Sequence, residues 1–303
     1  MKAIYTLLFA FIFLNSAAQT EKTISDTILL PEEEAPAITQ DDNPMLFWHR
    51  RRFKASAGLY FPVNNTEIRV DGSQGNFGTT IDLEDDLGFE KNTFSWTGAL
   101  EWRISRKSRL SFEYFYLNRE SSKTLEREIE FEDNTYEVNA RIYAFFDMQI
   151  LRVAYGYSFV CQPKYEIGAL IGAHTIFADV GIGLETSIGQ AEASNSFGFT
   201  APLPDLGLYG EIVLSPKFGL YVNANYLALK VDNIKGRIMS SNLSVLYNVY
   251  KNFSLTLGYT GLNVRVDVER ERASGYFKWG YNGPMLTANY TFGKHVSSQK
   301  KQK

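Results

Sequence analysis

The chain has 303 residues, with 31 Lys and Arg against 34 Asp and Glu, so its formal net charge is -3 at pH 7. This slightly acidic balance argues against a nucleic acid as partner. Cys161 is the single cysteine, which excludes an intrachain disulfide framework, and we expect an unpaired thiol rather than a nucleophile.

The first residues have the layout of a secretory signal peptide. Lys2 precedes an apolar run, Ala3 to Leu14, and a small-residue stretch ends at Ala18. An apolar run of about 12 residues is too short to cross a bilayer as a helix, which needs about 20. We therefore expect residues 1–18 to be a cleaved export signal. No later stretch approaches 18 apolar residues, so we expect no helical membrane span.

Three further segments follow in chain order. Residues 19–50 are acidic, contain several prolines and lack an apolar period, which predicts a disordered arm. From residue 51 to residue 292, apolar and polar side chains alternate in runs that end in turn signals, a pattern typical of β-strands. Residues 293–303 form a basic tail.

The clearest alternation covers residues 93–104, where Phe94, Trp96 and Leu100 share one face and Thr93 lies on the other. Comparable runs occupy residues 53–61, 110–116, 151–159, 165–173, 206–214, 218–226, 243–249, 253–259 and 286–292. Their lengths suit strands that cross a bilayer at a tilt, which takes about 9–11 residues. Trp and Tyr near the ends of the runs suit an interfacial aromatic girdle.

The connections between the runs alternate in length. Short ones span residues 105–108, 161–164, 215–217 and 251–252, and long ones span residues 62–91, 120–148, 178–202 and 266–281. Short periplasmic turns and long extracellular loops are typical of outer-membrane barrels. We therefore predict an all-β fold, a transmembrane antiparallel up-and-down β-barrel of about ten strands with both termini in the periplasm.

One region does not fit a single strand. Ile142 is out of phase with Leu151, which predicts a bulge near Asp147 or a separate hairpin. The hairpin, together with a strand over residues 67–84, would give about twelve strands.

The segment Thr80 to Phe89 is similar to the first loops of poorly characterised barrels, and the start of the chain looks like the signal peptides of Bacteroidota. In layout the chain resembles bacterial outer-membrane β-barrel proteins, small porin-like barrels of the OmpA or OmpW kind. The resemblance implies residence in the outer membrane, contact with outer-membrane lipid and lipopolysaccharide, and recognition by the barrel assembly machinery. Tyr290 and Phe292 match the aromatic end that this machinery reads, although Thr287 stands where a glycine is usual.

Candidate catalytic residues are few. Catalytic barrels of the protease and lipase types need a His beside a carboxylate or a hydroxyl. Of His49, His174 and His295, only His174 falls in a predicted strand, and no Asp-x-His or His-x-Ser pair surrounds it. We therefore predict that the protein is not an enzyme and has no catalytic residue, metal or cofactor. The acidic stretch Asp82 to Asp86 lacks the spacing of a calcium loop, which favours a solvated loop.

The strand parity points seven charged side chains into the lumen, because a charge that faces lipid is costly. They are Lys54, Glu101, Arg103, Glu113, Arg152, Glu166 and Glu211. We favour a network of opposite charges that fills a small barrel, in which Arg103, Glu113, Arg152 and Glu166 form a closed set.

The predicted function is that of a non-enzymatic structural or interaction barrel with a charge-filled lumen. A narrow porin-like channel for small solutes or ions is the alternative, and an outer-membrane enzyme ranks third. A protein partner would bind the extracellular loops or the periplasmic tails.

Overall fold

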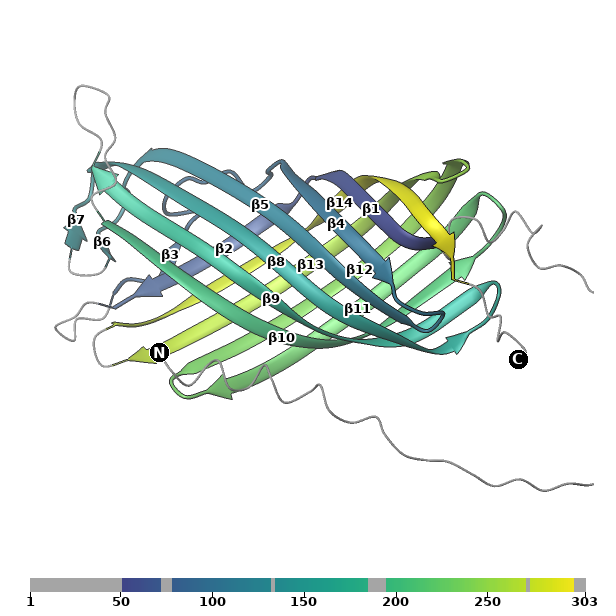
Figure 1. Cartoon of the computed structure of the whole chain (residues 1–303). Helices are drawn as coiled ribbons and strands as arrows, with labels where there is room; N and C mark the ends of the chain where they lie inside the picture. The colour runs from purple at the N-terminus through teal and green to yellow at the C-terminus, as the bar shows by residue number, and fades with distance from the viewer. Residues whose placement is uncertain (1–50, 72–77, 132–133, 185–194, 271–272, 297–303) are drawn as a thin grey trace, which may run out of the picture. The chain divides into compact units, whose positions relative to one another are not determined.

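The structure is a computed structural model that describes residues 51–71, 78–131, 134–184, 195–270 and 273–296 (Figure 1). The chain divides into two compact units, residues 1–42 and 43–303, and all described residues belong to the second. The expected export signal, the acidic arm, His49 and most of the basic tail lie outside the described residues.

The described residues form an antiparallel sheet that closes into a barrel. Its strands in chain order are β1 (Arg51–Tyr60), β2 (Val63–Val70), β3 (Ile81–Asp82), β4 (Ser95–Arg103), β5 (Ser108–Thr124), β8 (Arg141–Cys161), β9 (Tyr165–Leu184), β10 (Asn195–Val213), β11 (Phe218–Val231), β12 (Ile234–Tyr250), β13 (Phe253–Arg270) and β14 (Ala273–His295). Pairing of β1 with β14 closes the ring. A separate small hairpin consists of β6 (Ile129–Phe131) and β7 (Asn134–Tyr136). In this part of the chain, no helix is long and apolar enough to cross a membrane.

The ring has ten positions, because β1 and β2 lie end to end along β14. Tyr60 of β1 pairs with Met285, and Val63 of β2 pairs with Asn282 further along the same strand. The predicted antiparallel barrel of about ten strands is therefore confirmed. The sheet contains twelve strands when β2 and β3 are counted, as the alternative expected, but residues 141–161 form one strand rather than the hairpin on which that alternative also depended.

Four short turns define one end of the barrel, which we call the short-turn end. They span residues 104–107, 162–164, 214–217 and 251–252. The register pairs Arg51 with His295, so β1 begins and β14 ends at this same end. We call the opposite end the far end.

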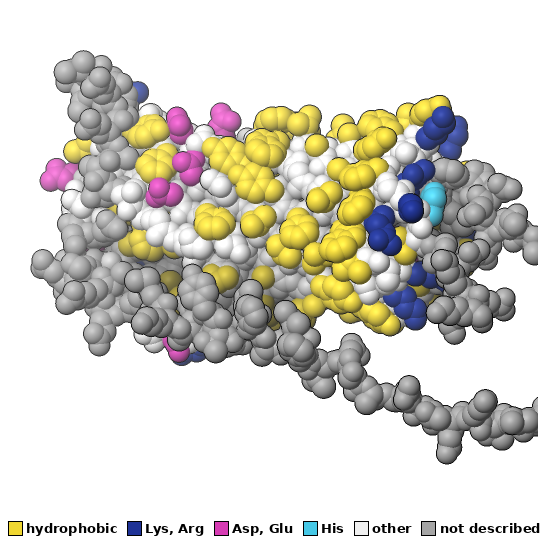
Figure 2. All heavy atoms as spheres, in the orientation of Figure 1, with side chains coloured by type: hydrophobic (Ala, Val, Ile, Leu, Met, Phe, Trp, Pro, Cys, Tyr) yellow, Lys and Arg dark blue, Asp and Glu magenta, His cyan; other side chains and the backbone are white. Residues whose placement is uncertain are grey.

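The two halves of the barrel have opposite polarity. Near the short-turn end the outward side chains are apolar and exposed, as in Leu100, Leu151 and Leu257. Toward the far end the apolar side chains point inward and are fully buried, as in Phe146 and Trp279. Figure 2 shows this as apolar side chains that gather over one half and acidic side chains over the other. We call the apolar outer surface the belt.

Strand β8 carries both patterns without interruption. Ile142, Phe146 and Ile150 point inward, while Leu151 and Tyr155 point outward. Pairing with β5 and β9 continues without a shift as far as Ser158. The predicted bulge or hairpin near Asp147 is therefore wrong: the backbone keeps its phase and the apolar side chains change faces.

The same change of face explains why the predicted long loops are wrong in extent. Residues 63–70, 120–124, 141–148, 178–184 and 195–202, and most of residues 266–281, are strand. The predicted runs follow apolar side chains on the outward face, and that pattern ends where the apolar residues turn inward. The strands continue beyond that level with a polar outer face.

The connection from β2 to β4 fills a gap in the barrel wall. Its backbone pairs with β2 through Leu83 N, which donates to Thr66 O at 2.9 Å. A side-chain contact joins it to β5, because Arg119 donates to Glu84 Oε1 at 2.8 Å. Glu84 is buried, so the segment Asp82 to Asp86 is not the solvated loop that we expected. It takes the place of the far half of the short strand β4.

Candidate functional site in the barrel lumen

The far half of the lumen is filled by an apolar plug. Its aromatic members come from β5, β8, β10 and β14 and meet across the lumen: Phe115, Phe146, Phe199, Phe277, Trp279 and Tyr281. Phe115 stacks on Tyr281 with ring centroids 5.3 Å apart, and Phe199 contacts Phe277 at 5.2 Å. Contacts between opposite walls show that side chains occupy the lumen at this level, as in the core of a soluble protein.

Charged side chains occupy the other half, and the first group lies nearest the short-turn end. Arg103 Nη1 of β4 lies 2.8 Å from Glu166 Oε2 of β9, and both side chains are almost fully buried. Ser158 hydrogen-bonds to Glu166, and its hydroxyl lies 2.7 Å from that of Tyr209. The buried charges are thus paired and hydrogen-bonded, as stable buried ions must be.

A second group gathers around Glu101. Its carboxylate accepts from Lys54 Nζ at 3.5 Å and from Arg109 Nη1 at 3.4 Å. Arg109 also pairs with Glu211 at 3.6 Å and stacks over the ring of Tyr209 at 3.7 Å. This guanidinium therefore links β5 with β4 and β10.

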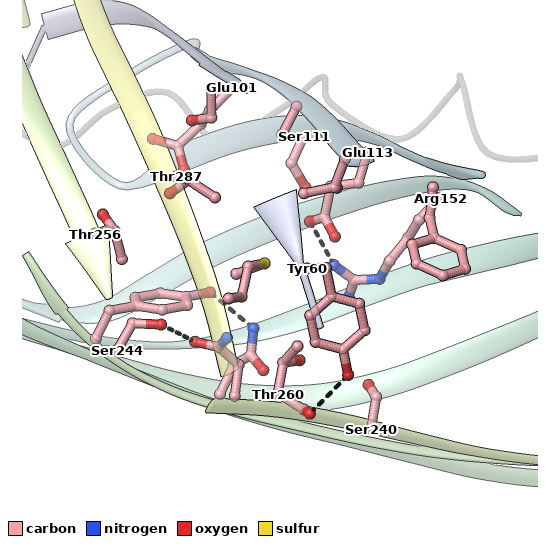
Figure 3. Close-up of a pocket in the computed structure, with 18 of the residues that line it drawn as sticks. Tyr60, Glu101, Ser111, Glu113, Arg152, Ser240, Ser244, Thr256, Thr260 and Thr287 are labelled. Carbon is pink, nitrogen blue, oxygen red and sulfur yellow. Dashed lines mark hydrogen bonds and ion pairs between the residues drawn. The ribbon is translucent and has the colours of Figure 1, made fainter. Parts of the chain in front are cut away.

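The third group is centred on Arg152 of β8. Its guanidinium lies 2.9 Å from Glu113 Oε1 and 3.3 Å from Asp205 Oδ1 (Figure 3 shows the contact with Glu113). The other oxygen of Asp205 lies 2.7 Å from His174 Nδ1. Asp205 is fully buried, and its two partners come from the two strands before β10 in the ring, β8 and β9.

The structure places all seven charges that parity assigned to the lumen inside it, but it changes their partners. The expected closed set divides into two pairs, Arg103 with Glu166 and Arg152 with Glu113. Arg109 and Asp205 were not predicted. Arg109 has the same parity as Glu113, so the alternation in residues 110–116 already contained the signal.

A cavity of about 270 Å³ lies between the plug and the charged groups. On one side it is lined by charged residues of β1, β4, β5, β8 and β10, including Lys54, Glu101 and Arg152. On the other side, β11 to β14 present neutral groups: small polar ones such as Ser244, Thr256 and Thr287 (Figure 3), the tyrosines Tyr221 and Tyr281, and a few apolar ones. Within the described part of the chain, no group of three His, Cys, Asp or Glu residues could hold a metal ion.

Comparison with known proteins identifies the class of fold. No protein-family model matches the chain, and no curated protein matches it. Among solved structures, the outer membrane protease OmpT from Escherichia coli matches with a TM-score of 0.52 and 12% identity, over 79% of this chain and 96% of that one. The translocator domain of autotransporter NalP from Neisseria meningitidis matches with a TM-score of 0.45 and 11% identity, over 81% and 91%. The fold is that of an outer-membrane β-barrel protein.

The similarity to OmpT corrects our prediction that the protein is not an enzyme. OmpT is a protease with this fold, so the fold gives no reason to exclude an enzyme. At 12% identity, the similarity shows the fold alone. The sequence around His174 contains no Asp-x-His or His-x-Ser pair, but the structure places a carboxylate beside this side chain. The carboxylate comes from Asp205 on the neighbouring strand β10, a contact that a search for local motifs around His174 does not reach.

The predicted assembly signal lies at the end of the closing strand. Tyr290 and Phe292 point outward from β14 and are exposed, with ring centroids 6.3 Å apart. Phe292 also stacks against Phe53 of β1 at 5.3 Å, at the seam where the ring closes. His295 ends β14 and is exposed, away from the lumen groups.

Proposed function

We propose that the protein is an interaction barrel of the outer membrane that binds a partner through its far half. The observation that carries the proposal is the reversal of polarity along the strands. Strand β8 has 21 residues, whereas a bilayer crossing needs about 9–11. The remaining residues, about 10–12 of them at about 3.3 Å each, extend roughly 35 Å along the strand beyond the bilayer.

The proposed orientation has the short-turn end in the periplasm and the far half outside the cell. The belt would contact outer-membrane lipid and lipopolysaccharide, and the barrel assembly machinery would read Tyr290 and Phe292. The acidic arm and the basic tail would then lie in the periplasm. The far half carries polar side chains outside and an apolar core inside, so it does not need lipid around it. Such a polar outer face suits the binding of a protein partner.

The channel alternative has less support. The apolar plug and three groups of paired charges occupy the lumen, so we expect no continuous water path. Purified protein in a planar bilayer should give no stable conductance steps. Steady single-channel currents would favour the channel and contradict a closed interaction barrel.

The orientation is tested with single cysteines in a Cys161→Ser background. Asn263→Cys lies on the outer face of the far half, and Lys217→Cys lies in a short turn. A membrane-impermeant maleimide should label Asn263→Cys on intact cells, and Lys217→Cys only after the outer membrane is permeabilised. The reverse pattern would invert the proposed orientation.

The binding role is tested by a photo-crosslinking amino acid at Asn263 and, as a matched control on the same strand, at Leu257 of the belt. A protein adduct of discrete mass at position 263 but not at 257 is expected. Absence of protein adducts at Asn263, with lipid adducts at Leu257, would contradict a partner on this face.

A further inference from the structure

One wall of the lumen cavity carries no charged side chain. Strands β11 to β14 turn nine small neutral polar side chains toward it: Asn223, Asn225, Ser240, Asn242, Ser244, Thr256, Thr260, Thr287 and Asn289. Longer side chains at these positions would fill the space. Small ones leave the cavity open. Several of them hydrogen-bond to one another, as Asn225 does to Ser240 and Ser244 to Asn242, and their remaining donors and acceptors can bind a ligand.

The charged wall is balanced and already paired. The cationic side chains that line the cavity are Lys54, Arg109 and Arg152, and the anionic ones are Glu101, Glu113 and Glu211. Each of them contacts an opposite charge within the wall. A charged ligand would have to break one of these pairs and leave a charge without its partner, which is costly in a lumen of low dielectric. A neutral ligand avoids that cost.

The surface of the cavity that faces the plug is aromatic. Tyr60, Phe115 and Tyr281 line it, and they pack against one another with centroids 5.2 to 6.0 Å apart. The hydroxyl of Tyr60 donates to the carbonyl oxygen of Thr260 at 3.0 Å (Figure 3), which fixes the ring in place. Rigid aromatic rings beside polar groups suit a molecule with one apolar face and many hydroxyls.

The size of the cavity limits its occupant. About 270 Å³ equals roughly nine waters at about 30 Å³ each, and it lies just below the ~300–1,000 Å³ of most small-molecule sites. The side chains of Lys54 and Glu113 are 32% and 44% exposed, so the cavity leaves free space beside them. The apolar plug closes the far side, so we take the short-turn end, past the polar side chains of the charged groups, as the side of entry.

We propose that this cavity is a binding site for a neutral polyhydroxylated molecule of monosaccharide size, which enters from the short-turn end. Its hydroxyls would hydrogen-bond to the neutral wall, and its C–H face would pack on the rings of Tyr60, Phe115 and Tyr281. The site is separate from the outer surface of the far half, so it does not depend on the interaction role proposed above.

The test uses the full chain, folded in lipid nanodiscs, and measures binding by saturation-transfer NMR and calorimetry. The probes are D-glucose and N-acetylglucosamine, with sodium phosphate as the anion and glycine as the zwitterion. We expect saturable binding of at least one sugar and none of phosphate or glycine. Asn242→Leu, which removes a polar group from the neutral wall, should weaken sugar binding at least tenfold.

Two further variants keep the result interpretable. Ser240→Phe fills the cavity and should abolish sugar binding, whereas Asn263→Leu, on the outer face of β13, should leave it unchanged. A gel shift between boiled and unboiled samples verifies that each variant is folded. Folded wild type that binds neither sugar, that binds phosphate or glycine instead, or that binds sugar equally well in Asn242→Leu and Ser240→Phe overturns the proposal.

Discussion

At the scale of single residues, the pairing of Arg103 with Glu166 shows what sequence parity can and cannot supply. Parity puts each side chain in the lumen, because lipid excludes charge. It does not choose partners, since β4 and β9 are separated in the ring by β5 and β8. Arg103 and Glu166 meet only through the curvature of the closed barrel. The sequence therefore predicts which charges lie inside and not which of them touch.

Replacing Arg103 by Met should destabilise the barrel by about 3–5 kcal/mol, because it leaves the buried Glu166 carboxylate without its cation. The double change Arg103→Met and Glu166→Gln should recover part of that loss, since no charge is then unpaired. Urea midpoints in lipid vesicles measure both. Small and additive effects of the two single changes would contradict a closed pair.

Asp86, which lies outside the belt, should make the stability of residues 78–94 depend on pH. Burial raises the pKa of its carboxyl, but hydrogen bonds from Arg127 and from the Asp82 N–H outweigh burial and hold that pKa below its usual range. A lowered folded pKa contributes stability that is fully present above the unfolded value of about 3.9 and is lost as the pH falls through the folded value. Amide protection in residues 78–94 should therefore fall between pH 4 and pH 2.

Hydrogen exchange, corrected for the intrinsic rate at each pH, measures this loss. Asp86→Asn should show low protection already at pH 7 and little further change on acidification. An acid response of equal size in Asp86→Asn would assign the effect to another group.

At the scale of elements, β8 shows why the sequence pattern was misread. The alternation of apolar and polar residues has the correct period throughout, but the apolar set lies on even positions up to residue 150 and on odd positions after it. A search for one continuous apolar face interprets this change as a break. Residues 141–161 form one strand, and the apolar side chains change from its inner to its outer face.

Substitutions on the outer and inner faces of β8 test whether the apolar side chains change faces near residue 150. Leu151→Arg puts a charge on the belt and should cost about 2–4 kcal/mol in lipid. Phe146→Ala removes a buried ring from the plug and should cost about 3–5 kcal/mol. Gln149→Arg, outward in the far half, should be nearly neutral. Unfolding in urea from vesicles gives all three values, and a large penalty for Gln149→Arg would mean that lipid reaches that level.

At the scale of the whole molecule, the ring of ten positions was predictable because each short turn joins two antiparallel runs, and the turns can be counted. The far half was not predictable in the same way. Its outer face is polar and its inner face is closed by side chains from distant strands, such as Phe146 of β8 and Phe277 of β14. Such contacts appear only once the ring is closed.

The tryptophans report how deeply the barrel is immersed. Trp96 and Trp102 point outward with 48% and 38% of their surface exposed, whereas Trp279 lies in the plug with none exposed. In variants that keep one of these tryptophans, brominated lipids should quench Trp96 and Trp102 strongly and Trp279 weakly, because this quenching needs contact. Equal quenching of Trp279 would place lipid inside the far half.

The reversal of polarity also fixes the membrane thickness that the protein accepts. On β8 the outer face changes from Gln149 to Leu151 within one step of the alternation. A shift of two residues, about 6.6 Å along the strand at about 3.3 Å per residue, would immerse polar side chains or expose apolar ones around the whole ring. A barrel cannot bend or tilt single strands to compensate as a lone helix can. A bilayer of different thickness must therefore itself deform to match, at a cost that grows with the mismatch and favours one membrane over another.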